Sequence, residues 1–267
     1  MKWILLASIL LIACSSELNI VSGPFLIKDG LTYHQATNKL VTGISQDFYE
    51  NGQLKSRTTF RGGKQHGLYE SFYKSGQLKK RAFYASGLLN GSRELFDSNG
   101  QLGVKENYVK GTIHGVQKFY SNGIMRERSV VEMGNWTGPL QLYYEDGNLM
   151  SKVEFINSKR HGTARIFYKS GQLGISGQYK NHKKHGLFNS YSSDGKEYAS
   201  WQCDLGKYIK GTYKLSVGKI NEVMPFVENS PFNGAVVNPF DQENPSTIEV
   251  EGNSYWLCSS YNMEGSI

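Results

Sequence analysis

The stretch GISQDFYENGQL at residues 43–54 decides the fold, because its pattern returns along the chain. It recurs as GLYESFYKSGQL at residues 67–78 and as GTARIFYKSGQL at residues 162–173. Glycine marks the start of each unit every 23 to 25 residues, at Gly43, Gly67, Gly91, Gly115, Gly138, Gly162, Gly186 and Gly211. Self-similarity at such a period is the signature of a repeat protein.

Each unit also contains a turn sequence in which Asn, Asp or Ser precedes a glycine. These turn glycines are Gly52, Gly76, Gly100, Gly123, Gly147, Gly171 and Gly195. Asn-Gly and Asp-Gly favour a two-residue type I′ turn, because both central residues of that turn need positive φ. The sequence therefore predicts about seven β-hairpins and an all-β fold, an elongated antiparallel sheet of tandem hairpins with a small C-terminal β cap.

A two-residue turn fixes which residues face each other across a hairpin. In the first unit, Tyr49 then faces Leu54 and Gly43 faces Phe60. The same arithmetic pairs Gly67 with Tyr84, Gly91 with Tyr108, Gly138 with Phe155, Gly162 with Tyr179 and Gly186 with Cys203. An aromatic ring opposite a strand glycine can cover its bare backbone. The unit from Gly115 is one residue short before its turn, which predicts a bulge or slip there.

This pattern resembles the variant MORN repeat (membrane occupation and recognition nexus). Its local form is glycine, four residues, an aromatic pair, one further residue and Asn-Gly-x-Leu, closing at Lys-x-x-Gly or Lys-x-His-Gly. The resemblance covers about residues 26–211, with 33–43 as a degenerate first unit. It implies the elongated hairpin sheet. Some bacterial members are labelled antitoxins, and that label is an analogy that a shared fold does not secure.

The first residues predict export. Lys2 precedes an apolar run over 4–13, which is too short to span a bilayer and is typical of a signal peptide. The run ends in Leu11-Ile12-Ala13-Cys14 and resembles the lipobox of bacterial lipoproteins. The resemblance implies cleavage before Cys14, lipidation of its sulfur, and, because Ser15 follows, an outer-membrane anchor in the cell envelope. The alternative is an ordinary signal peptide that contains a cysteine.

Charge and proline content divide the chain. Residues 43–219 carry a net charge of +13, whereas residues 220–267 carry −7 and contain neither Lys nor Arg. Four of the six prolines lie beyond residue 220. We therefore expect a signal peptide at 1–13, a linker at 14–25, the hairpin array at 26–215 and an acidic cap at 216–267. Short strands are expected in the cap at 213–217, 234–237, 247–250 and 255–258.

Cysteine and histidine are the next candidates for chemistry. Cys203 and Cys258 are an even pair in an oxidising compartment, so a disulfide is predicted, with two buried thiols as the alternative. Four histidines stand directly before a repeat glycine: His66, His114, His161 and His185. Successive repeats hold them about 10 Å apart, whereas zinc binds its ligands at about 2.1 Å. They are therefore expected to form turns, and no metal or cofactor is expected.

Two surfaces are candidates for binding. Tyr49, Tyr73, Tyr144 and Tyr168 recur on one side, and tyrosine is enriched at interfaces. Intramolecular packing is the alternative for these rings. The basic residues Lys79, Lys80, Arg81, Lys183 and Lys184 could bind anionic lipid head groups or lipopolysaccharide phosphates. They could equally be a solvated face, or could be masked by the acidic residues 220–267.

No catalytic motif is present. The chain has no Gly-x-Ser-x-Gly, no His-Glu-x-x-His and no glycine-rich phosphate loop. The preferred hypothesis is a non-enzymatic, envelope-anchored protein that binds a protein partner, without nucleic acid or a small-molecule cofactor. In its finer version, that partner is a toxin, which the protein neutralises. The first alternative is a structural or anionic-lipid-associated envelope lipoprotein. The second is an enzyme whose site lies in the C-terminal cap.

Overall fold

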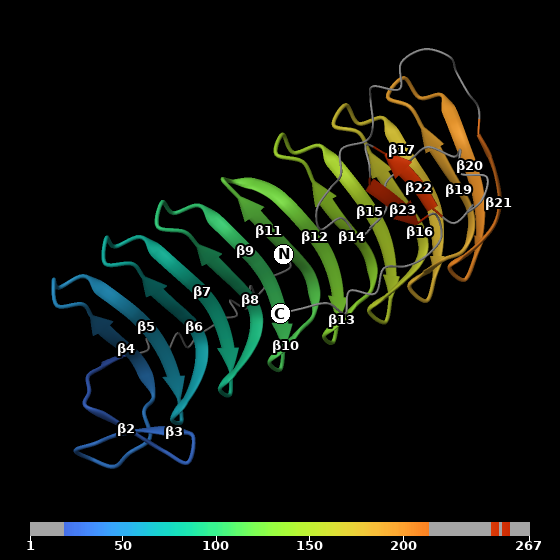
Figure 1. Ribbon diagram of the computed structural model, residues 1–267. Helices are drawn as coiled ribbons and strands as arrows, with labels where there is room; N and C mark the ends of the chain where they lie inside the picture. The colour runs from blue at the N-terminus through green and yellow to red at the C-terminus, as the bar shows by residue number, and fades with distance from the viewer. Residues whose placement is uncertain (1–18, 214–246, 251–252, 257–267) are drawn as a thin grey trace, which may run out of the picture.

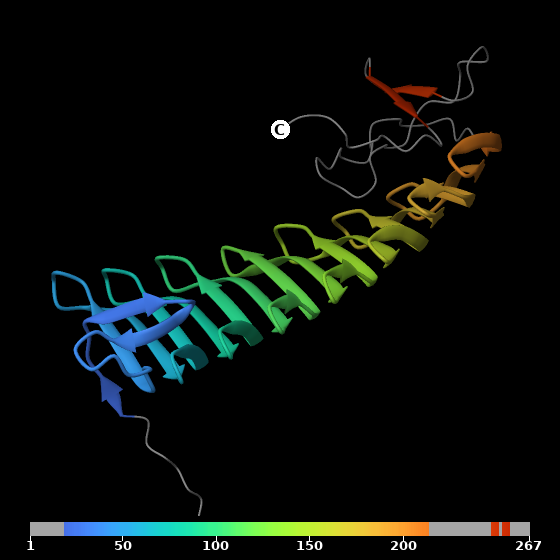
Figure 2. The same ribbon diagram turned by 90° about the horizontal axis from the view of Figure 1, so that it is seen from below.

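A computed structural model describes residues 19–213, 247–250 and 253–256. Nineteen strands of this part form one sheet. From β4 onward, the strands pair antiparallel in chain order, so each hairpin adds to the previous one. Figure 1 shows the resulting long array, and Figure 2 shows it from the edge as a single layer that twists along its length. The predicted all-β sheet of tandem hairpins is confirmed.

The strands of this sheet are short and regularly spaced. They are β1 (Ile20–Val21), β4 (Gly43–Phe48), β5 (Leu54–Arg61), β6 (Lys64–Phe72), β7 (Leu78–Ala85), β8 (Leu88–Phe96), β9 (Leu102–Val109), β10 (Thr112–Ile113), β11 (Gly115–Ser121), β12 (Ile124–Glu132), β13 (Asn135–Trp136), β14 (Gly138–Tyr143), β15 (Leu149–Ile156), β16 (Lys159–Phe167), β17 (Leu173–Lys180), β18 (Lys183–Lys184), β19 (Gly186–Tyr191), β20 (Glu197–Asp204) and β21 (Lys207–Tyr213).

The predicted hairpin turns exist, but six of the seven are of a different type. In the first, the Tyr49 amide donates to the Gln53 carbonyl and the Gly52 amide donates to the Tyr49 carbonyl. Only the glycine of each of these six turns has positive φ, which defines a three-residue loop with a bulged glycine rather than a type I′ turn. The shortened unit is the exception, because Asn122 and Gly123 both have positive φ.

Two-residue type I′ turns occur instead at the opposite edge of the sheet, where the sequence analysis placed none. Both central residues have positive φ in Gly62-Gly63, Ser86-Gly87, Lys110-Gly111, Met133-Gly134, Asn157-Ser158, Asn181-His182 and Leu205-Gly206. Backbone hydrogen bonds join these turns to the preceding hairpin, for example from the Gly111 amide to the Leu89 carbonyl at 2.7 Å. We call this border the tight-turn edge and the other, with the three-residue loops, the loop edge.

The predicted glycine register is confirmed in all six hairpins. Gly43 pairs with Phe60, Gly67 with Tyr84, Gly91 with Tyr108, Gly138 with Phe155, Gly162 with Tyr179, and Gly186 with Cys203. Next to the turn the prediction is wrong, because Phe48 rather than Tyr49 pairs with Leu54. The loop is one residue longer than predicted, and a one-residue register shift at Asp47 restores the pairing farther along the strand.

The expected irregularity in the unit from Gly115 is present, and Gly115 there faces Val131 instead of an aromatic ring. The same kind of register shift occurs in the other hairpins too. What distinguishes this unit is therefore its type I′ turn, which the missing residue imposes.

The repeat glycines are required by the backbone. In β6, the three residues 66–68 lie opposite Thr59, so the strand bulges there. Gly67 has φ of 91°, and the corresponding glycines of the other hairpins also have positive φ. Glycine adopts this conformation at little cost. A Cβ built at Gly67 would meet Thr59 at 3.6 Å, which is ordinary van der Waals contact. The positive φ, and not crowding, therefore selects glycine at this position.

The N-terminal part differs from the expected first repeat. β2 (Phe25–Lys28) and β3 (Leu31–His34) form a separate two-stranded sheet. This hairpin is attached to the first tight turn through hydrogen bonds from the Thr32 amide to the Gly63 carbonyl and from the Gly63 amide to the Val41 carbonyl. β1 lies within the predicted linker and pairs parallel with β4, so it covers the first strand of the array.

Only two strands of the expected C-terminal cap are described. β22 (Thr247–Val250) and β23 (Asn253–Trp256) form an antiparallel pair. β22 has the predicted bounds, and β23 overlaps the strand predicted at 255–258. The signal peptide, Cys14, Cys258 and the strand predicted at 234–237 lie outside the described residues.

Candidate functional site

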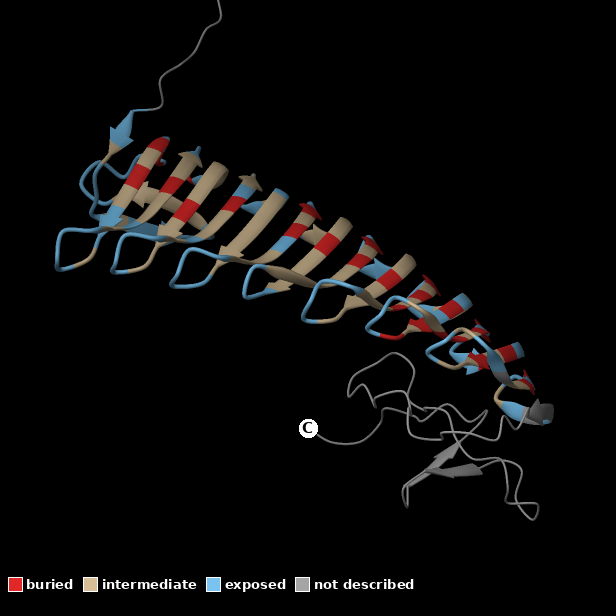
Figure 3. Ribbon diagram, turned by 90° about the horizontal axis from the view of Figure 1, so that it is seen from above, coloured by how far each residue is buried: buried red, intermediate tan, exposed pale blue. Residues whose placement is uncertain are grey.

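The sheet presents two faces with different chemistry, because successive side chains of a strand alternate between them. One face contains Ala82, Val153 and Ala164, which are fully buried, and we call it the core face. The other carries Arg57, Glu70 and Arg81, and we call it the ladder face. In Figure 3, bands of buried residues cross the strands while the loops are exposed.

The core face changes from polar to apolar along the array. Its buried apolar cluster lies between β14 and β20 and includes Val153, Phe188 and Trp201. The rings of Phe188 and Trp201 are stacked with centroids 5.6 Å apart. Gly177 lies beneath Phe188, and a Cβ there would come within 2.0 Å of the ring. Close packing therefore selects glycine at this position, although its φ is ordinary.

In the middle of the array, the core face holds a polar network around Glu106. Arg93 Nη2 lies 2.8 Å from Glu106 Oε2, and the Tyr108 hydroxyl donates to the same carboxylate. Gln117 Nε2 donates to Glu106 Oε1, and the Ser129 hydroxyl donates to Gln117 Oε1. Burial, followed by the bond to Glu106, raises the pKa of Tyr108. Each oxygen of the Glu106 carboxylate therefore has at least one partner within the sheet.

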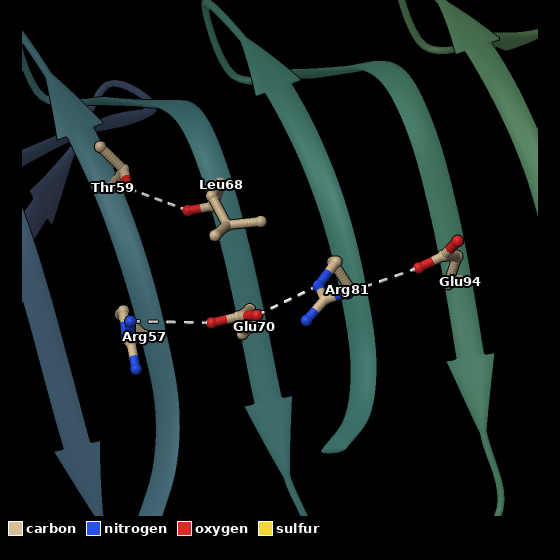
Figure 4. A network of polar contacts seen from close by, with 6 residues as sticks. All are labelled: Arg57, Thr59, Leu68, Glu70, Arg81 and Glu94. Atoms are coloured by element: carbon tan, nitrogen blue, oxygen red, sulfur yellow. Dashed lines mark hydrogen bonds and ion pairs between the residues drawn. The ribbon is translucent and has the colours of Figure 1, made fainter. Parts of the chain in front are cut away.

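On the ladder face, opposite charges alternate across neighbouring strands (Figure 4). Arg57 Nη1 lies 3.8 Å from Glu70, and Arg81 Nε lies 3.1 Å from the same carboxylate. Arg81 also approaches Glu94 at 3.8 Å, and Lys105 Nζ lies 2.8 Å from Glu94. These residues form one continuous row over β5 to β9 in which each acid lies between two cations.

The four predicted partner-binding tyrosines make a repeated contact within the sheet, and we call them the contact tyrosines. Each hydroxyl donates to a backbone carbonyl of the next repeat: Tyr49 to Phe72 at 2.8 Å, Tyr73 to Phe96 at 2.8 Å, Tyr144 to Phe167 at 2.7 Å and Tyr168 to Tyr191 at 2.9 Å. Asp97 occupies this position in the third hairpin and accepts bonds from its own loop. The contacts support the alternative of intramolecular packing, and partner binding through these rings stays a prediction.

The five predicted lipid-binding residues do not form one surface. Lys184 is buried, and burial lowers its pKa to about 8, with Arg160 adding to the effect. Lys80 lies over the Tyr69 ring on the core face, whereas Arg81 is ion-paired on the ladder face. The two exposed members, Lys79 and Lys183, lie near opposite edges of the sheet. These five residues therefore do not share one face, and their binding of anionic lipid stays a prediction.

The repeat histidines do not form the turns that were predicted, because His66 and His161 lie within β6 and β16, but two of the four contact a tight turn of the next hairpin. The Ser86 amide lies 3.5 Å from His66 Nδ1, and the Met133 amide lies 3.4 Å from His114 Nδ1. His185 Nδ1 lies 3.1 Å from Asp204. Cys203 is buried and disulfide-bonded, while its predicted partner Cys258 lies outside the described residues.

Sequence reasoning missed a line of exposed apolar side chains along the tight-turn edge. It consists of Leu88, Val109, Met133, Trp136 and Ile156, which are between 38 and 52% exposed. We call it the apolar ridge. Each member lies in a tight turn or within two residues of one. The available signal was a large apolar residue in or beside five of the seven tight turns, and it had no context because the tight turns themselves were not predicted.

The tight turns that carry these side chains are joined to one another, although Trp136 points to the core face and Leu88 and Ile156 to the ladder face. Leu88 reaches the next turn, with its Cδ2 atom 3.7 Å from a Cβ built at Gly111. The Trp136 ring packs edge-on against Phe155, and its carbonyl accepts a bond from the Ser158 amide at 2.8 Å. The ridge therefore runs along a rigid, hydrogen-bonded border.

Among residues 19–213 and the two short C-terminal strands, no three His, Cys, Asp or Glu side chains are grouped so as to hold a metal ion. Within the same residues, no helix has the length and apolar character needed to cross a bilayer.

The architecture defines the class of protein, a single-layer β-sheet repeat protein built from tandem hairpins. The sequence pattern of the MORN repeat variant matches residues 41–61, 65–86, 136–157 and 160–181. The chain therefore carries MORN repeats of the variant type. The unmatched middle contains Asp97 in place of the contact tyrosine and the shortened unit from Gly115. A search of curated proteins finds no match to the chain.

Proposed function

We propose that this chain is a non-enzymatic repeat protein, lipid-anchored in the bacterial cell envelope, that binds a protein partner. The observation that carries the proposal is the apolar ridge. Single exposed apolar side chains are normal, whereas several that follow one edge of a sheet suit contact with a partner. With neighbouring tight turns about 10 Å apart, the ridge from Leu88 to Ile156 extends over about 30 Å, which is long enough for a protein interface.

The anchor and the toxin-neutralising role have separate support. The apolar run ending at Cys14 supports lipidation and an outer-membrane location. Neutralisation of a toxin is the finer proposal and is supported by the antitoxin label of some MORN-repeat proteins. The structural use of the contact tyrosines moves the favoured binding surface from those rings to the ridge.

Site-specific photo-crosslinking in the parent bacterium tests this function. A crosslinking amino acid at Met133, on the ridge, should capture one dominant protein. The same amino acid at Ser98, exposed on the loop edge, is the matched control and should not capture it. Replacing Leu88 and Ile156 with Ser should abolish capture from Met133. Equal capture at Met133 and Ser98, or no protein adduct at all, would contradict the proposal. Recovery of lipid alone, released by salt, would favour the lipid-associated alternative.

A further inference from the structure

The row that carries the ion pairs continues across the ladder face with four cations and one glutamine, and without a carboxylate. Beyond Lys105, the register places Lys118 next in the row, followed by Arg128, Gln141, Lys152 and Arg165. We call Lys105, Lys118, Arg128, Lys152 and Arg165 the cation row. From β11 to β16 no carboxylate lies in it, whereas Glu70 and Glu94 occupy it in β6 and β8.

Three members of the cation row have no acidic partner among the described residues. Lys105 is paired with Glu94, and Lys152 lies 3.5 Å from Glu154 of its own strand. Arg128 donates to the neutral Gln141 at 3.1 Å. No ion pair or hydrogen bond of the side chains of Lys118 and Arg165 occurs within residues 19–213.

Like charges face each other directly in this row. Lys118 lies between Lys105 on one neighbouring strand and Arg128 on the other, and Lys152 lies opposite Arg165. Like charges opposite one another destabilise a sheet. The same row is neutralised by built-in acids in the first hairpins, so the fold can accommodate them there. An external anion would supply in β11 to β16 what Glu70 and Glu94 supply in β6 and β8.

An apolar row borders the cation row on the loop-edge side of the same face. It consists of Tyr120, Met125, Tyr143, Leu149, Phe167 and Leu173, all partly buried, and these residues pair with one another across the hairpins. Burial raises the pKa of the Tyr143 hydroxyl, and the nearby positive charge of Arg128 lowers it by a smaller amount. A ligand lying here would meet cations and apolar side chains side by side.

We propose that the cation row binds an extended acidic segment of a partner polypeptide, in which acidic residues alternate with apolar ones. This inference rests on the proposed function and specifies its partner. The row crosses five strand intervals, about 24 Å, which an extended chain covers in about seven residues. Carboxylates pair with the cations, and the apolar residues contact the bordering row. A purely anionic polymer would leave that apolar row unused.

Binding of a defined peptide tests the inference. The probe is a fluorescent octapeptide of alternating Glu and Tyr, measured by anisotropy against the soluble chain from residue 15 in about 0.15 M salt, where exposed charges are screened beyond about 8 Å. In the test variant, Lys118, Arg128 and Arg165 are changed to Gln. The control variant changes the exposed Lys74, Lys180 and Lys183 to Gln and so removes the same charge elsewhere.

The test variant should bind the peptide about tenfold more weakly, because three exposed ion pairs are lost, while the control variant stays within about twofold. Equal weakening by both variants would overturn the proposal, as would displacement of the peptide by inorganic polyphosphate or anionic vesicles at lower concentration. If the peptide test fails while ridge-dependent crosslinking at Met133 persists, only this inference is wrong. If both fail, the proposed function is wrong too.

Discussion

Removing one tyrosine hydroxyl tests whether the contacts between repeats stabilise the array. The Tyr144 hydroxyl donates to the Phe167 carbonyl at 2.7 Å, whereas the hydroxyl of its neighbour Tyr143 makes no hydrogen bond among the described residues. Tyr144→Phe keeps the ring and removes one hydrogen bond, so it should lower the free energy of unfolding by about 0.5–1.5 kcal/mol. Tyr143→Phe removes the hydroxyl of another partly buried ring, which makes no such bond, and should have nearly no effect.

The assay is guanidinium unfolding of the chain from residue 15, followed by tryptophan fluorescence. Changing all four contact tyrosines, Tyr49, Tyr73, Tyr144 and Tyr168, to Phe should cost about 2–6 kcal/mol if the sites act independently. Equal losses for Tyr143→Phe and Tyr144→Phe would refute the reasoning, because the loss would then follow from the hydroxyl and not from its bond.

The stabilisation that Tyr144 contributes should depend on pH in a defined direction. Burial, followed by the charge of Asp146, raises the pKa of Tyr144 above its ordinary value of 10.0. The folded protein therefore holds that proton more tightly than the unfolded chain, and the stabilisation is present below pH 10 and is lost as the pH rises further. The deficit of Tyr144→Phe should accordingly shrink above pH 10. A deficit that grows there would contradict the hydrogen-bond explanation.

Three further predictions concern the core face. Gly177→Ala should destabilise the fold by about 1–3 kcal/mol in the same denaturation assay, because the new methyl group overlaps the Phe188 ring. The control is Gly103→Ala, where the nearest atom lies 3.7 Å from the added Cβ, and its effect should stay within about 0.5 kcal/mol. Burial raises the pKa of Glu127 from 4.5, which means that the fold disfavours its charged form. Glu127→Gln should therefore raise the melting temperature at pH 7. A gain that persists below pH 4.5 would show that the buried charge is not the cause. Burial raises the pKa of Tyr179 to about 12, so ultraviolet titration should show its hydroxyl ionising after those of the exposed tyrosines. The free energy of unfolding should accordingly fall as the pH rises above 10. Ionisation of Tyr179 together with the exposed rings would count against its burial.

The hairpins and their phase could be predicted from the sequence, because local chemistry decides them. A glycine with positive φ closes each predicted loop, and the pairing of Gly43 with Phe60 recurs in the later repeats. Two local errors cancelled in that prediction. The loop is one residue longer than a type I′ turn, and a register shift of one residue on the following strand compensates for it.

The candidate sites could not be predicted in the same way, because they depend on pairing between hairpins. The bulge at residues 66–68 adds two residues to one strand, and it occurs at a glycine that reads like any other strand glycine. Without that offset, Arg57, Glu70 and Arg81 cannot be placed in one row. Lys79, Lys80 and Arg81 differ from this case, because the alternation of side chains along a single strand already sends neighbours to opposite faces.

The sequence alone therefore determined that this chain is a row of hairpins, since turn propensity and the alternation of side chains act over a few residues. Only the tertiary structure decided what the repeated residues do. It directed the hydroxyls of Tyr49 and Tyr144 to carbonyls 23 residues away, and it aligned Lys118 with Arg128. Those outcomes depend on the register between neighbouring hairpins, which is set by bulges and close packing along the whole sheet rather than by any single segment.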